Sequence, residues 1–150
     1  MSSYESIKKK YGLSSIEELN KSFPTNFDEE EKTDLVRTIC KKMLSKLNFI
    51  TKTLEGVIQP QQQYGRMQEA SRMRLDKKNI AHQLYKESMH LQKSLLRHII
   101  IFNEEKTAKE IKQSFPIFRN IEEEMTELLQ EISEGWKRER RREDLGQYFG

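Results

Sequence analysis

The sequence predicts an all-α protein, an elongated hairpin or bundle of three long helices with coiled-coil-like seams, preceded by short N-terminal helices. Three observations support this fold class. Apolar residues recur at helical spacing over long stretches, strand-like alternation never extends beyond a few residues, and only three prolines and six glycines interrupt 150 residues. The composition agrees, since 34% of the residues are charged and 35% are hydrophobic, which is typical of long helices.

Two short helices are expected at the N-terminus. Residues 3–10 form the first, and Gly12 ends it because glycine readily adopts the left-handed conformation that closes a helix. Ser14 precedes Glu17 by three positions, which is the spacing of a capping box. This pair predicts the start of the second short helix.

The segment Phe23-Pro-Thr-Asn-Phe27 breaks the chain after these helices. We expect its two phenylalanines to fold over a helix end as a plug, and a short docking peptide for another protein is the alternative. The sequence therefore divides into an N-terminal part, 1–27, and a three-helix bundle or coiled-coil region, 28–150.

Residues 28–58 are expected to form the first long helix. A run of acids at 28–31 suits its positive N-terminal end, and Gln59-Pro60 ends it. Apolar residues alternate four and three apart along it, which is the a/d pattern of a coiled coil held for three heptads. The predicted partner-binding seam comprises Val36, Met43, Leu47, Ile50, Leu54 and Val57, with Cys40 at a further core position.

Residues 59–66 form the expected loop, and about 67–103 form the second long helix. Its part at 80–102 carries two neighbouring apolar stripes, whereas 66–79 has few large apolar groups. In an antiparallel hairpin, the strongly apolar end of the first helix, 47–57, would lie opposite this apolar-poor start. We therefore expect the cover for 47–57 to come from the third helix or from a second chain.

The third long helix is expected from about residue 104. Its apolar residues at helical spacing are Ile111, Phe115, Phe118, Met125, Leu129, Ile132 and Trp136. Pro116 lies inside this pattern, and a proline removes a backbone hydrogen bond and clashes with the preceding turn. The sequence therefore predicts a kink or a break between 113 and 117.

Motifs typical of catalysis or of cofactor binding do not occur in the sequence. The six glycines are isolated, so there is neither a phosphate-binding glycine loop nor a G-x-S-x-G nucleophile elbow. Cys40 falls on a core position of the first long helix, where burial makes a thiol inert. We therefore expect no enzyme activity and no cofactor.

The histidines give no sign of a metal site. His82, His90 and His98 follow one another at intervals of eight, so they rotate around a helix instead of converging on one ion. Glu87 and His90 have the E-x-x-H spacing of carboxylate-bridged metal bundles, but such sites need two copies of the motif and two further glutamates. The sequence holds one copy, so we expect no bound metal.

Positive charge is concentrated in the second long helix and not at the C-terminus. The stretch GWKRERRRED at 135–144 belongs to a segment, 121–150, with five basic and nine acidic side chains. Its arginines are expected to pair with nearby glutamates and with the helix dipole. Residues 59–103 hold eight basic and three acidic side chains. The candidate phosphate-binding residues within them are Arg66, Arg72, Arg74, Lys77 and Lys78.

These observations favour a non-catalytic helical interaction or scaffold protein that assembles with itself or with another helical subunit through heptad seams. The alternative is a helical protein that binds nucleic acid without sequence preference through the basic patch at 66–78. The single cysteine, the lack of a signal segment and the short apolar runs favour an intracellular protein, cytoplasmic or nuclear, with no membrane partner.

Overall fold

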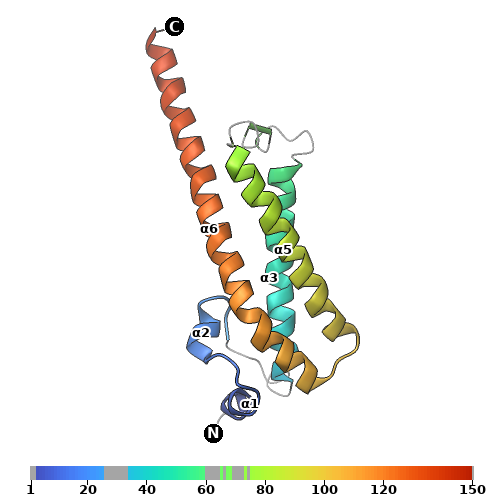
Figure 1. Cartoon of the computed structure of the whole chain (residues 1–150). Coiled ribbons are helices and arrows are strands. Elements are labelled where there is room, and N and C mark those ends of the chain that lie inside the picture. Colours follow the sequence, from blue (N-terminus) through green and yellow to red (C-terminus); the bar gives the residue numbers. More distant parts are fainter. Residues whose placement is uncertain are drawn as a thin grey trace.

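The computed structural model describes residues 3–25, 34–59, 65, 67–68, 73 and 75–149, with side chains from Tyr4 to Arg138. Within these residues the structure is helical and has no strand, so the all-α prediction is confirmed. Three long helices pack side by side into an elongated bundle, and two short N-terminal helices lie against its lower end (Figure 1).

The first short helix, α1 (Ser3–Tyr11), ends one residue later than the predicted range, directly before Gly12. Gly12 has a φ of 67°, and its N–H donates to the carbonyl oxygen of Lys8 at 2.8 Å. Because a side chain is strained at this φ, glycine is the residue that closes α1 at low cost. The Tyr4 hydroxyl of α1 donates to the carbonyl oxygen of Ser14, which holds the helix against the linker that follows.

The second short helix, α2 (Ile16–Asn20), starts one residue later than the predicted capping box implies. Ser15, and not Ser14, is the N-cap, and its hydroxyl accepts a hydrogen bond from the Glu18 N–H at 3.2 Å. Two serines in succession each precede a glutamate by three positions, so the spacing alone does not choose between them.

Phe23 is buried as the predicted plug requires, but it packs against the interior of the third long helix and not over a helix end. The Phe23 ring meets that of Phe118 edge to face, with the centroids 6.3 Å apart. Edge-to-face contact is a favourable geometry for aromatic rings, so this residue closes the core between the N-terminal part and the bundle. Phe27 lies outside the described residues.

The first long helix, α3 (Leu35–Ile58), ends at the predicted residue but begins later than position 28. The backbone of Asp34, with φ −143° and ψ 64°, is not helical, and this fixes the start at Leu35. Asp34 also forms an ion pair with Arg37 in the first turn, 3.3 Å from carboxylate to guanidinium. Residues 28–33 lie outside the described part of the chain.

The second long helix, α5 (Leu75–Ile100), runs antiparallel to α3 (Figure 1). It ends three residues before the predicted boundary, and most residues of the predicted loop and helix start, 60–74, lie outside the described part. Cys40 of α3 donates from its thiol to the Leu95 carbonyl, 3.6 Å away, near the lower end of the hairpin.

The third long helix, α6 (Glu104–Phe149), runs through Pro116 without interruption, so of the two predicted alternatives, a kink or a break, the break is wrong. A proline inside a helix costs about 3 kcal/mol or more. Its neighbours Phe115 and Phe118 are buried and stack with ring centroids 6.0 Å apart, and this packing keeps the segment helical. α6 bends in its first third, which contains the proline (Figure 1).

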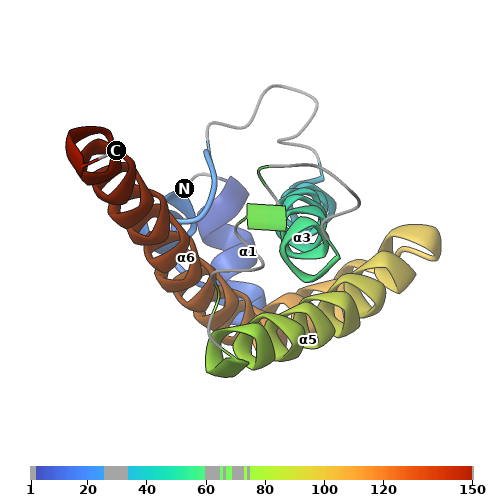
Figure 2. The same cartoon turned by 90° about the horizontal axis from the view of Figure 1, so that it is seen from above.

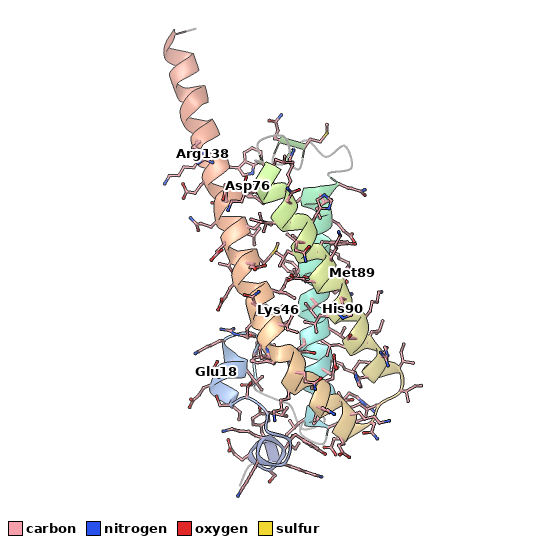
Figure 3. All side chains as sticks on the ribbon, viewed as in Figure 1. Glu18, Lys46, Asp76, Met89, His90 and Arg138 are labelled. Atoms are coloured by element: carbon pink, nitrogen blue, oxygen red, sulfur yellow. The ribbon has the colours of Figure 1, made fainter. Side chains whose placement is uncertain are left out.

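α6 supplies the cover that the α3–α5 hairpin lacks. It folds back along α3, where Lys46, labelled in Figure 3, forms an ion pair with Glu122. The buried Leu128 of α6 belongs to the same core as Leu54. Of the two alternatives for covering 47–57, the structure shows the third helix of the same chain.

α6 is much longer than the helices it packs on. It has 46 residues against 24 in α3 and 26 in α5, which corresponds to about 69 Å against about 36 and 39 Å. Beyond Arg138 its ribbon stands clear of the other helices (Figures 1 and 3), and from above its C-terminal part points away from α3 (Figure 2).

Candidate functional site

The predicted partner-binding seam of α3 lies inside the bundle. Five of its six side chains are buried and the sixth is half-buried; they are, in order, Val36, Met43, Leu47, Ile50, Leu54 and Val57. Helices α5 and α6 of the same chain pack against α3. The seam thus has apolar cover within one chain, and a surface for a second chain has to be sought on another side.

The candidate phosphate-binding residues are only partly placed by the structure. Arg66, Arg72 and Arg74 lie outside the described residues. The Lys77 ammonium turns toward α6, 3.1 Å from the Glu131 carboxylate, and Lys78 is exposed. Of the two described members of the set, Lys77 therefore faces α6 and Lys78 faces solvent.

Cys40 is a core residue. Its side chain is fully buried, and burial, with a smaller contribution from the negative charge of Glu110, raises the pKa of the thiol to about 12. Since the thiolate is the reactive form, a thiol with this pKa is neither a nucleophile nor a metal ligand at neutral pH.

A thiol reagent such as DTNB is expected to leave the native protein unlabelled at pH 8 and to label one thiol per chain in urea. At that pH the native thiolate fraction is about a thousandfold below that of a thiol with a pKa of 9. The released chromophore measures the rate, and native labelling at the unfolded rate would contradict the buried position of Cys40.

No metal centre is formed by the side chains placed between Tyr4 and Arg138. His82 and His90 are exposed on α5 and His98 is half-buried there. Among the described residues, no three histidine, cysteine, aspartate or glutamate side chains come close enough to hold a metal ion.

A solvent-open cavity of about 370 Å³ lies between the end of α3 and the start of α5. Its lining residues are Glu55, Ile58, Gln59, His82, Tyr85 and Lys86. The Tyr85 hydroxyl donates to the Glu55 carboxylate at 2.9 Å; this hydrogen bond, followed by burial, raises the pKa of Tyr85. The phenol therefore keeps its proton at neutral pH and acts as a donor.

Sequence reasoning missed this cavity. Its residues follow the same pattern in both helices, at 55, 58 and 59 and at 82, 85 and 86, so each set shares one helix face. The pattern within either helix is visible in the sequence, but the pairing of the two faces depends on the register of α3 against α5.

A polar cluster joins the N-terminal part to α3 and α6. The Ser22 hydroxyl donates to the Glu122 carboxylate at 2.6 Å and accepts from the Arg119 guanidinium at 2.8 Å. The Lys46 ammonium contacts the same carboxylate and the Ser22 carbonyl oxygen. Because the Glu122 side chain is only 12% exposed, these contacts compensate for its loss of water and fix the position of three segments.

Above this cluster, the side of the bundle between α3 and α6 carries exposed apolar residues. On α3, Phe49 lies three residues after Lys46. On α6, Leu129 and Trp136 lie seven and fourteen residues after Glu122. Helical spacing therefore places all three on the same side of the bundle as the polar cluster. Their exposed fractions are 69%, 42% and 38%. We refer to these three residues as the α3–α6 flank.

Comparisons with protein-family models, with curated proteins and with solved structures found no match. None of the described helices is long and apolar enough to cross a membrane. A proposal about function therefore depends on the surfaces and contacts of this chain alone.

Proposed function

We propose that the protein is a non-catalytic helical interaction protein that assembles with a second copy of itself or with another helical subunit. The observation that carries this proposal is the shape of α6, which runs past the bundle and leaves Leu129 and Trp136 exposed on the α3–α6 flank. A helix of the partner would lie along α6 and pack against α3 and α6 at the flank.

The energetics of helix packing favour a partner on the α3–α6 flank. A helix in water owes most of its stability to the packing of its apolar face, and α6 continues beyond the helices that cover its first two thirds. Aromatic residues such as Phe49 and Trp136 are common in the buried centres of protein interfaces, where a few side chains carry most of the binding energy.

The test measures the molar mass of the purified chain by light scattering, and its sedimentation in a native extract. Leu129→Asp is expected to weaken the assembly at least about thirtyfold, because it places an unpaired carboxylate at the centre of an apolar contact. Phe49→Asp is expected to have an effect of similar size.

Asn120→Asp and Asn48→Asp are the matched controls, since both residues are exposed. Asn120 lies nine residues before Leu129, which places it on the opposite side of α6. Both controls should assemble like the wild type. A chain that stays monomeric in isolation and sediments as a monomer in the extract would refute the proposal.

A further inference from the structure

The outward side of α5 carries a continuous basic stripe. Its members follow one another at intervals of four, four, four, three and four, which keeps them on one side of the helix. All six are exposed, and they are Lys78, His82, Lys86, His90, Lys93 and Arg97. The stripe is about 28 Å long, and Figure 3 marks His90 in the middle of α5.

No described carboxylate forms an ion pair with this stripe, although Glu55 lines the same cavity as His82 and Lys86. α5 carries two acids, Asp76 and Glu87. Asp76 interacts with another group, and Glu87 accepts a hydrogen bond from the Gln83 side chain. Glu87 follows Lys86 directly, so it points about 100° away. From α3, Glu55 reaches the cavity beside Lys86, where the Tyr85 hydroxyl binds it.

The charges of the stripe are not neutralised by the described part of the chain. None of the ion pairs between described side chains includes a member of the stripe, whereas neighbouring Lys77 is paired with Glu131. Three lysines and one arginine thus present four permanent positive charges in one line; they are Lys78, Lys86, Lys93 and Arg97.

Exposed aliphatic residues mark both ends of the stripe. Leu75 is 74% exposed and Ile100 is 72% exposed, and Ile101, just beyond the helix, is 80% exposed. Leu75 and Ile100 are 25 residues apart, so their side chains leave α5 within about 20° of the same direction and about 38 Å from each other. Both ends of α5 therefore present an apolar group toward the side that carries the bases.

We propose that this side of α5 docks onto the surface of an anionic lipid membrane. The four permanent charges lie against the lipid phosphates and carboxylates, and Leu75, Ile100 and Ile101 enter the boundary of the acyl chains. This surface is distinct from the α3–α6 flank, so the two proposals stand or fall separately.

The exposed aliphatic residues favour lipid over nucleic acid as the partner. A nucleic acid also offers a line of phosphates. Its backbone, however, has no apolar region that could take up Leu75 and Ile100, whose side chains lie about 38 Å apart, roughly the length of α5. A membrane offers both negative charge and a hydrocarbon boundary along its whole surface. Each base near an anionic membrane strengthens binding about fivefold, so four contribute on the order of several hundredfold.

The test is cosedimentation of the whole chain with phosphatidylcholine vesicles, with and without phosphatidylserine. Binding is expected only with phosphatidylserine and is expected to weaken as salt is raised. A stripe variant should bind more than a hundredfold more weakly; its substitutions are Lys78→Gln, Lys86→Gln, Lys93→Gln and Arg97→Gln. A control of equal charge change should lose much less; its substitutions are Lys9→Gln, Lys41→Gln, Lys52→Gln and Lys109→Gln.

A second variant separates lipid insertion from charge. Leu75→Ser with Ile100→Ser should weaken vesicle binding at least about tenfold and leave its dependence on salt unchanged. All substituted residues are exposed, so each variant should keep the cooperative melt of the wild type.

Three results would overturn the proposal. The first is no binding to phosphatidylserine vesicles by the wild type, and the second is equal loss in the stripe variant and its charge-matched control. The third is tight binding of a DNA or RNA oligonucleotide that depends on the stripe and not on Leu75 and Ile100, which would make this surface a nucleic-acid site.

Discussion

Replacing Leu47 by aspartate is expected to unfold the chain. Leu47 has no exposed surface and lies in the core that α3 shares with α5 and α6. A carboxylate there loses its water without gaining a partner, and the leucine contacts are lost as well, which together cost more than about 4 kcal/mol. A domain of this size has a total stability of about 5–15 kcal/mol, so circular dichroism should show a lost or strongly lowered melt.

Asn48→Asp is the control for Leu47→Asp, because it adds the same charge at the next residue of α3, where the side chain is exposed. Its midpoint of unfolding should stay close to that of the wild type. A Leu47→Asp variant that melts like this control would show that α3 is not buried as described. Because Leu47 supports the fold, its substitution cannot report on assembly, and the exposed α3–α6 flank serves that purpose.

Phe118→Ala is expected to lower the free energy of unfolding by about 3–5 kcal/mol. The Phe118 side chain is fully buried and its ring contacts those of Phe23 and Phe115, at centroid distances of 6.3 and 6.0 Å. Removal of the ring leaves a cavity where the N-terminal part meets α6. Urea unfolding measures the change, and native-state proteolysis should also become faster near Phe23, because this residue loses its aromatic partner.

Ile117→Ala is the matched control, since Ile117 is adjacent on α6 and 51% exposed. It should cost less than about 1 kcal/mol. Equal losses for the two variants, or a loss below 1 kcal/mol for Phe118→Ala, would contradict the position of α6 in the core.

The fold class and the position of the α3 seam follow from local physics, which a sequence displays directly. The four-and-three spacing from Val36 to Leu54 defines one side of a helix, and that side is buried in the structure. Gly12 is a second such case, because a helix end that needs a positive φ selects glycine locally.

Choices between neighbouring residues were harder to predict. Met125 is followed by Leu128 at three and by Leu129 at four, and both spacings fit a helix. Leu129 is the predicted member of the apolar stripe, whereas the structure buries Leu128 and leaves Leu129 42% exposed. The packing of α6 against α3 and α5 decides between them, and no local pattern carries that information.

The surfaces depend still more on tertiary register. The Ser22–Glu122 contact joins residues 100 positions apart, and the cavity at Glu55 and Tyr85 needs α3 and α5 in one particular alignment. The basic stripe of α5 was counted within the excess charge of 59–103, but its outward direction emerged only once the buried side of α5 was known. The expected absence of a membrane partner rested on spanning length, which says nothing about a helix lying on a lipid surface.

The contacts of Ser22 and Phe23 also set an order of events during synthesis. Ser22 binds Arg119 and Glu122, which are 97 and 100 residues further along the chain, and Phe23 packs against Phe118. At translation rates of about 5–20 residues per second, the ribosome needs roughly 5–20 s to make these partners after it has made Ser22. The N-terminal part therefore leaves the ribosome first, keeps Phe23 exposed until α6 has been made, and packs against α6 last.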